Sequence, residues 1–173
     1  MTVYATEVES AAALDLILDQ VNLFTIYREV RGTLLQPRPG QVDKSVRIDR
    51  VLLPTERLLA LGWPHGIVGV EIKKDEATTL GPAIAQAMDY TRSVFTLAPW
   101  NYQVILGFVF LWPMPKQSGP MASVCAQNRI GSVSATGWDP LQFKSGEQNV
   151  LRVHRDGQVS IGIGSNGNKV GSR

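Results

Sequence analysis

The sequence is poor in cysteine and has no long hydrophobic run, and both features exclude classes of protein. Its 173 residues include a single cysteine, Cys125, so there is neither an internal disulfide framework nor a cysteine-based zinc site. The longest apolar run, Val104–Trp112, is far shorter than the roughly 20 residues that cross a bilayer. Acidic residues interrupt the early apolar positions, so no signal peptide is expected. We therefore expect a cytoplasmic protein that does not enter a membrane.

Net charge is low as well, because 17 lysines and arginines face 15 aspartates and glutamates, which gives a formal net charge of +2. This total does not indicate nucleic-acid binding, but the distribution is uneven. The basic residues crowd the first half of the chain: Arg28, Arg31, Arg38, Lys44, Arg47, Arg50, Arg57, Lys73 and Lys74. Local clustering of this kind can form a phosphate-facing surface, although scattered solvated cations would look the same in a sequence.

Composition and pattern predict one α/β domain over residues 1–173, since 44% hydrophobic and 18% charged residues are ordinary values for a globular protein. Ser10 is a candidate N-cap of an amphipathic helix that runs to Val21. The other elements expected in the first two thirds are strands over 24–31 and 46–53, a helical turn near 56–61, a third strand ending at Glu71, a helix from Thr78 to about Phe95, and a strand over 104–111.

The last third is expected to form an extension of the main domain. A helix over 122–130 precedes two short strands, 151–154 and 158–161, which an Asp156-Gly157 turn would join. The tail rich in glycine, serine and asparagine, from residue 162 onward, is expected to be flexible.

Within residues 66–74, an apolar, β-branched run ends in two charged positions, Glu71 and Lys73. Side chains at i and i+2 of a strand leave the same face, so this carboxylate and ammonium are presented side by side. Buried strands seldom carry charge without a partner or a function. A simple salt bridge at the strand end is the alternative, and the surrounding residues must decide between them.

Polar residues on the neighbouring elements favour a metal site. Asp49 lies in the preceding predicted strand, and Gln86 and Tyr90 are four residues apart on the following helix. Carboxylates on neighbouring strands can converge on Mg²⁺, which binds a few carboxylates and keeps several waters. Phosphodiester hydrolysis needs an activated water and a cation that neutralises charge on the phosphate, and Lys73 could orient that water.

Three segments, 48–49, 70–73 and 86–90, resemble in order the motifs of the PD-(D/E)xK (restriction-endonuclease-like) nuclease superfamily. The third is similar to the Gln-x-x-x-Tyr element of RecB-type and Cas4-like members. The resemblance covers about residues 9–112 and implies a restriction-endonuclease-like core, a mixed central sheet flanked by helices in the order αβββαβ. Residues 113–173 lie outside it.

The resemblance implies a metal site and a catalytic lysine. Asp49 and Glu71 would bind Mg²⁺, or Mn²⁺ in its place, together with the main-chain carbonyl of Ile72. Lys73 would be the catalytic residue beside that ion. The substrate would be DNA, and a homodimer is expected by resemblance only.

Supporting roles follow for other positions. Gln86 and Tyr90 would organise the site or contact DNA, and of the upstream acids that many members carry we favour Glu29 over Glu9. Ile48 stands where the family often has a proline, and the chain lacks the cysteines of members that hold an iron–sulfur cluster.

Most of these positions also have simpler interpretations. Asp49 can pair with Arg47 or Arg50, Glu29 with a nearby arginine, and the polar pair on the following helix can be an ordinary solvated face. The two histidines are expected to be structural or on the surface. The tryptophans are candidate base-stacking platforms, although packing in a core or interface is the stronger expectation for each: Trp63, Trp100, Trp112 and Trp138.

The leading hypothesis is therefore a Mg²⁺-dependent deoxyribonuclease. The first alternative is a catalytically inactive nucleic-acid-binding or scaffold protein that keeps the nuclease fold. A structural domain whose acids pair with arginines is the second. The sequence does not distinguish DNA from RNA or endonuclease from exonuclease activity.

Overall fold

The computed structural model describes residues 6–37, 39–74, 80–113, 119–162 and 170–171, and they form one mixed sheet with helices on both faces. The helices are α1 (Glu7–Val21), α2 (Glu56–Ala60), α3 (Leu80–Tyr90) and α4 (Gly119–Gln127). The strands are β1 (Phe24–Leu34), β2 (Ser45–Pro54), β3 (Val68–Ile72), β4 (Ser93–Leu97), β5 (Tyr102–Ile105), β6 (Phe108–Trp112), β7 (Ile130–Ser134), β8 (Leu141–Ser145), β9 (Gln148–Val153), β10 (Val159–Ile161) and β11 (Val170–Gly171). The predicted α/β class is confirmed.

The sheet has 11 strands in the order β11-β10-β9-β8-β7-β6-β3-β2-β1-β4-β5. β6 runs parallel to both β3 and β7, and the other neighbouring strands pair antiparallel. β3 therefore lies between β2 and β6, near the middle of the sheet. A strand covered in this way is expected to be apolar throughout, and every residue of β3 is buried.

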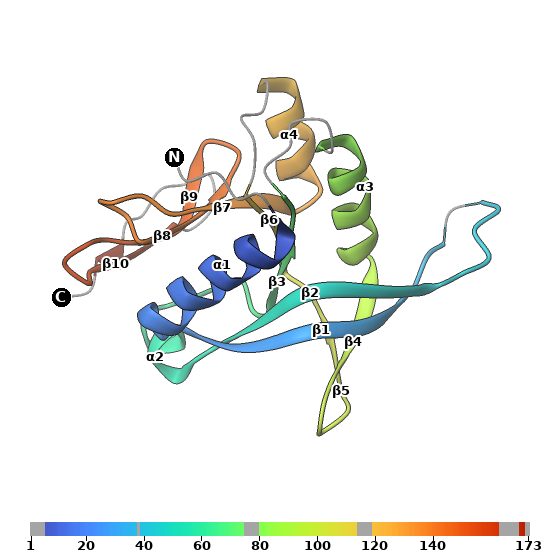
Figure 1. Ribbon diagram of the computed structural model, residues 1–173, viewed down its shortest axis with the longest axis horizontal. Helices are drawn as coiled ribbons and strands as arrows, with labels where there is room; N and C mark the ends of the chain where they lie inside the picture. The colour runs from blue at the N-terminus through green and yellow to red at the C-terminus, as the bar shows by residue number, and fades with distance from the viewer. Residues whose placement is uncertain (1–5, 38, 75–79, 114–118, 163–169, 172–173) are drawn as a thin grey trace.

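Helices cover both faces of the sheet. Leu14 and Leu18 of α1 pack into one buried cluster with β3 residues Val68 and Val70, whereas Ala87 of α3 belongs to a separate cluster on the other face. Figure 1 shows α1 lying across the front of the sheet, with α3 and α4 standing together above it. The β1–β2 hairpin and the β4–β5 hairpin both project away from the body of the molecule.

Helix α1 begins earlier than the sequence predicted. Thr6 is the N-cap: its side chain accepts from the Glu9 amide, and the Glu9 side chain accepts from the Thr6 amide. This capping box satisfies two of the amides left free at a helix start. The prediction that Ser10 is the cap is wrong, because Ser10 is a buried residue inside the helix.

Helix α3 is shorter than predicted, because it ends at Tyr90 and residues 93–97 form β4. Phe95 was expected on the helix but lies opposite Gly32 of β1, where a Cβ at position 32 would stand 2.7 Å from the Phe95 ring. This close packing of strand on strand outweighs the helical pattern. The predicted helix start at Thr78 and Thr79 lies outside the described residues.

The strand predicted over 104–111 is divided into β5 and β6, which separate at Leu106 and Gly107. A Cβ at Gly107 would overlap the carbonyl oxygen of His65, so the chain passes too close to its neighbour for any larger residue. β5 turns outward to pair with β4, and β6 enters the centre of the sheet.

The C-terminal third continues the same sheet. The helix predicted over 122–130 is α4, which ends at Gln127 and is followed by β7. The predicted strands and turn are confirmed as the β9–β10 hairpin, with Gly157 at φ +83°. In the tail that was predicted to be flexible, Val170–Gly171 pair with β10 as β11, whereas residues 163–169 and 172–173 are outside the described part of the chain; the flexibility itself stays a prediction.

Candidate active site at the end of β3

Glu71 is a charged residue within a strand whose other members are apolar. It is only 3% exposed, and its side chain lies at the carboxyl end of β3. Because Arg50 pairs with Val70 across β2 and β3, the next antiparallel position sets Asp49 opposite Glu71. The two carboxylates that the sequence singled out therefore belong to adjacent positions on adjacent strands.

Asp49 is held in place by the backbone of β3. Its Oδ2 accepts a hydrogen bond of 2.7 Å from the Ile72 amide, the residue that follows Glu71. The Asp49 charge also contributes to raising the pKa of Glu71, so the two carboxylates are near enough to repel one another. The structure thus brings Asp49 and Glu71 together.

Lys73 lies between the strand and helix α3. Its Nζ donates to Glu71 Oε1 at 2.6 Å and to Gln86 Oε1 at 3.0 Å. The Lys73 amide donates to the Trp112 carbonyl, which extends the pairing of β3 with β6. The salt bridge that was the simple alternative is present, and it forms part of a longer chain of contacts.

The polar pair on α3 completes that chain. Gln86 Nε2 donates to the Tyr90 hydroxyl at 2.6 Å, and the hydroxyl donates to the Arg47 carbonyl at 2.6 Å. Tyr90 is 2% exposed, so the interpretation of this pair as a solvated helix face is wrong. Gln86 is fixed at both ends of its amide, by Lys73 and by Tyr90.

Burial raises the pKa of two groups in the cluster, the Glu71 carboxyl and the Tyr90 hydroxyl. Burial, and then the nearby Asp49 charge, raise the pKa of Glu71 from 4.5 to about 7, although the Lys73 hydrogen bond opposes this change. Burial and the Glu71 charge raise the pKa of Tyr90 as well, so its hydroxyl stays a donor across the physiological range. Glu71 Oε2 is buried and has no hydrogen-bond partner among the residues that the structure describes, which is a costly state for a carboxylate oxygen.

The structure does not add the two upstream acids to this network. Glu29 forms an ion pair of 3.1 Å with Arg47, and both side chains are more than half exposed. Its backbone has φ +51°, which interrupts the alternation of β1. Glu9 belongs to the capping box of α1. The ion-pair interpretation therefore describes the contact of Glu29, and Glu9 serves the start of α1.

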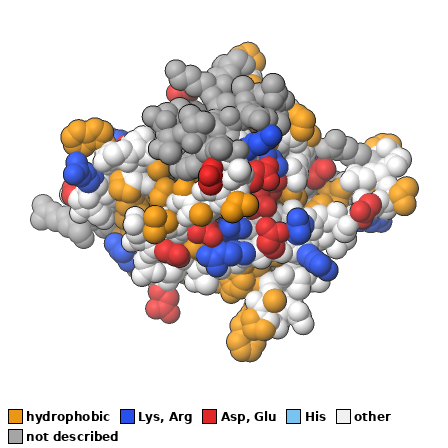
Figure 2. Space-filling model, viewed as in Figure 1, with side chains coloured by type: hydrophobic (Ala, Val, Ile, Leu, Met, Phe, Trp, Pro, Cys, Tyr) orange, Lys and Arg blue, Asp and Glu red, His pale blue; other side chains and the backbone are white. Residues whose placement is uncertain are grey.

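The neighbouring arginines are paired with other acids. Arg50 donates to both carboxylate oxygens of Asp15 at 2.8 and 3.1 Å, and Arg28 donates to the same carboxylate at 3.0 Å. Figure 2 shows acidic and basic side chains interspersed across the middle of the face on which α1 lies. Arg28 and Arg50 are therefore paired with an acid, and no continuous basic surface is visible on this face.

The donor set around β3 is small but suited to a hard cation. Among the described residues, no group of three or more histidine, cysteine, aspartate and glutamate side chains is placed to hold a metal ion. Two adjacent carboxylates remain, Asp49 and Glu71. Among the described residues Glu71 Oε2 has no hydrogen-bond donor, so this oxygen is available to a cation. Mg²⁺ binds with one or two carboxylates and retains waters, so these residues fit it.

Sequence reasoning missed one part of the cluster and one feature elsewhere. It did not anticipate that the Arg47 carbonyl would accept a hydrogen bond from the Tyr90 hydroxyl, because a backbone acceptor has no sequence signal. It also missed a polar cluster on β8 and β9, although alternation of Gln142 and Lys144 with apolar residues was a usable signal.

No protein-family description, curated protein or solved structure matches this chain. None of the described helices is long and apolar enough to cross a membrane.

Proposed function

We propose that the protein is a Mg²⁺-dependent nuclease that hydrolyses phosphodiester bonds of DNA at the end of β3. The observation that carries the proposal is the buried carboxylate of Glu71, set opposite Asp49 and bonded to Lys73. A strongly perturbed acid with a like charge and an amine beside it is typical of a catalytic site.

The order of elements supports a restriction-endonuclease-like core. Helix α1, strands β1, β2 and β3, helix α3 and strand β6 follow one another as αβββαβ, with α2 and the β4–β5 hairpin as additions. β6 returns parallel to β3, and the three earlier strands pair antiparallel in sequence order. The resemblance in the motifs and this topology are separate observations.

Asp49 and Glu71 are the proposed ligands of the ion, with the Ile72 carbonyl as a third oxygen. Mn²⁺ is expected to replace Mg²⁺. Bound there, the ion would neutralise charge on the phosphate and lower the pKa of a water. Its positive charge would also offset the repulsion between the two carboxylates.

The residues of the chain then have separate tasks. Lys73 has one donor beyond those used by Glu71 and Gln86, and this donor can bind the attacking water or a phosphate oxygen. Tyr90 holds Gln86, and Gln86 holds Lys73, so these two are positioning residues. In the reaction the water oxygen bonds to phosphorus, the bond to one ester oxygen breaks, and that oxygen takes up a proton.

A specific observation favours the second candidate, a nucleic-acid-binding or scaffold protein that has the fold without turnover. The described residues supply only two carboxylates at the site, fewer than the three that many members of the superfamily would provide. Such a protein would bind DNA with a steep salt dependence and would not cleave it. A cytoplasmic location and a homodimer belong to the proposal in either case.

Incubation of plasmid and single-stranded DNA with the protein in Mg²⁺, Mn²⁺ or EDTA tests the assignment. We expect cleavage with either metal, none in EDTA, and a loss of at least about 100-fold in Glu71→Gln and Lys73→Met, since each removes a group that acts in the reaction. Asp19→Asn, an exposed acid on α1, is the matched control and should cleave normally. Cleavage that survives in the Glu71 and Lys73 variants would show that this site is not responsible.

A further inference from the structure

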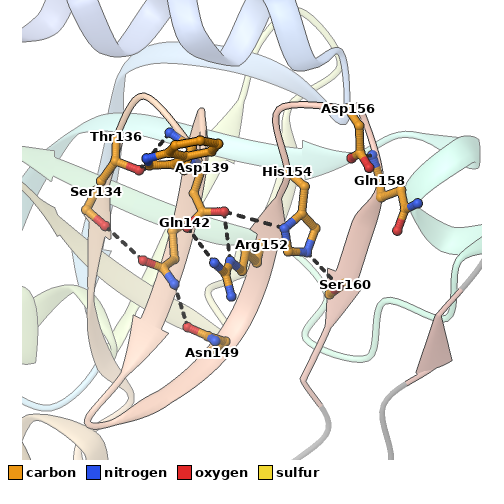
Figure 3. A network of polar contacts seen from close by, with 11 residues as sticks. Ser134, Thr136, Asp139, Gln142, Asn149, Arg152, His154, Asp156, Gln158 and Ser160 are labelled. Carbon is orange, nitrogen blue, oxygen red and sulfur yellow. Dashed lines mark hydrogen bonds and ion pairs between the residues drawn. The ribbon is translucent and has the colours of Figure 1, made fainter.

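The C-terminal strands have one apolar face and one polar face. Leu141, Phe143, Leu151 and Val153 are buried in the core that α1 also joins. Gln142 and Arg152, which alternate with these apolar residues, point the other way. Figure 3 shows the polar contacts on that side, whose residues come from β7, the loop before β8, β8, β9, the β9–β10 turn and β10. In the sheet β6 and β7 separate β8 from β3, so this face lies apart from the Glu71 site.

Many of the polar side chains on this face are fixed by one another. Arg152 Nε and Nη2 each donate to the Asp139 carboxylate at 2.8 Å, and His154 Nδ1 lies 3.5 Å from the same carboxylate. His154 Nε2 lies 3.0 Å from the Ser160 hydroxyl, as Figure 3 shows. Asp139 is 8% exposed. A preorganised group of this kind loses little conformational entropy when a ligand binds.

A pocket of about 580 Å³ opens beside this group. It is lined by Trp138, Asp139, Arg152, His154, Arg155 and Asp156. Trp138 is 76% exposed, although its main chain is anchored: the Arg155 amide donates to the Trp138 carbonyl at 3.0 Å, and the Trp138 amide donates to the Thr136 hydroxyl at 3.3 Å. An exposed indole ring on a fixed backbone offers a surface on which a planar ligand can stack.

The charged side chains of the pocket indicate which kind of planar ligand it can bind. The Asp139 carboxylate is already neutralised by Arg152, and Asp156 accepts from the Gln158 amide within its own turn. Arg155 is exposed and adjoins Trp138 through the backbone hydrogen bond. An aromatic platform with a guanidinium beside it suits a base and its phosphate, because the base stacks while the phosphate is bound by the cation.

We propose that this pocket binds one nucleotide of a single-stranded nucleic acid, with the base on Trp138 and the phosphate at Arg155. The inference rests on the proposed function for the identity of the polymer, and it gives the substrate strand a second contact away from the Glu71 site. A neutral sugar also stacks on tryptophan, but it offers no negative charge to the exposed Arg155 guanidinium that lines the pocket.

Fluorescence anisotropy with a labelled 12-nucleotide oligothymidylate, in EDTA so that no cleavage occurs, tests the inference. We expect Trp138→Ala to weaken binding about 5- to 100-fold, the range for loss of one base–aromatic stack, and Trp138→Phe to restore most of the affinity. Arg155→Ala should make the logarithmic salt slope shallower by about 0.7, as loss of one phosphate contact does for single strands. Trp100→Ala is the matched control, because that ring is 71% exposed on the β4–β5 hairpin.

The two proposals can fail separately. Unchanged affinity in folded Trp138→Ala, or displacement of the oligonucleotide by a neutral oligosaccharide, would overturn the nucleotide pocket even if the protein cleaves DNA. Binding that depends on Trp138 in a protein without nuclease activity would support the pocket and remove the catalytic assignment.

Discussion

At the scale of single residues, the buried Glu71 carboxylate lowers the free energy of unfolding. A carboxylate at 3% exposure gives up its hydration. Here it also faces the charge of Asp49, and one of its oxygens receives no hydrogen bond from the described part of the chain. One ammonium, Lys73, offsets only part of this cost. A neutral residue of the same shape would be more stable, so the arrangement makes sense as a site that a cation completes.

Replacing Glu71 by glutamine should therefore stabilise the protein in a way that depends on pH. The pKa of Glu71 is raised from 4.5 to about 7, so the folded state holds a proton that the unfolded state has lost, and stability falls as pH rises through this window. Glu71→Gln should match the wild type near pH 4 and exceed its free energy of unfolding by up to about 3 kcal/mol at pH 8. Urea unfolding across this range measures the difference.

Mg²⁺ provides the control for that measurement. Because the ion binds the charged carboxylates, it should stabilise the wild type more at pH 8 than at pH 6 and leave Glu71→Gln unaffected. A wild type that gains stability relative to the variant between pH 5 and pH 8 without metal would contradict the proposed state of Glu71.

The contacts among these residues were predictable where local geometry decides them. Spacing of i and i+2 placed Glu71 beside Lys73, and spacing of i and i+4 placed Gln86 beside Tyr90. Glu29 could not be placed in this way, because its positive φ interrupts the strand period on which the reasoning depends. Whether the carboxylates hold a metal is still a prediction.

At the scale of elements, α1 is attached to the sheet by a charged contact as well as an apolar one. Asp15 bonds Arg50 and Arg28, which pair across β1 and β2, so one carboxylate separates two arginines that would otherwise repel. The Arg50 side chain is 8% exposed. Sequence patterns predicted the helix and both strands but not this contact, because a pairing between distant positions has no local signal.

Asp15→Asn should destabilise the protein by about 2–3 kcal/mol, since it leaves the buried Arg50 guanidinium without a counter-charge. Burial alone would raise the pKa of Asp15, but the bonds to Arg50 and Arg28 outweigh it and lower the pKa below 3.8. The stabilisation that the charged Asp15 gives the folded state is therefore present above pH 4 and is lost as pH falls below 4. Glu29→Gln, which removes an exposed pair, should change stability by less than about 1 kcal/mol, and equal effects of the two variants would refute the distinction.

At the scale of the whole molecule, the C-terminal third belongs to the same sheet and core as the rest. β7 pairs in parallel with β6, and Phe143 of β8 contacts Phe24 of β1 and Phe110 of β6 through its ring. The sequence predicted an extension because the family resemblance stopped near residue 112 and the later strands are short. Strand order depends on which apolar faces meet across the sheet, and composition does not specify that.

Phe143 should consequently act on the stability of the entire chain. The ring is fully buried and lies in the core cluster that includes Leu14 and Leu18 of α1. Phe143→Ala should cost about 3–5 kcal/mol, because it removes apolar contact and leaves a cavity between strands distant in sequence. Guanidinium unfolding followed by tryptophan fluorescence and by far-ultraviolet circular dichroism should give one coincident transition, shifted equally in both signals. Separate transitions, with the variant moving only one of them, would mean that residues 113–173 fold as an independent unit and that the shared core does not couple them.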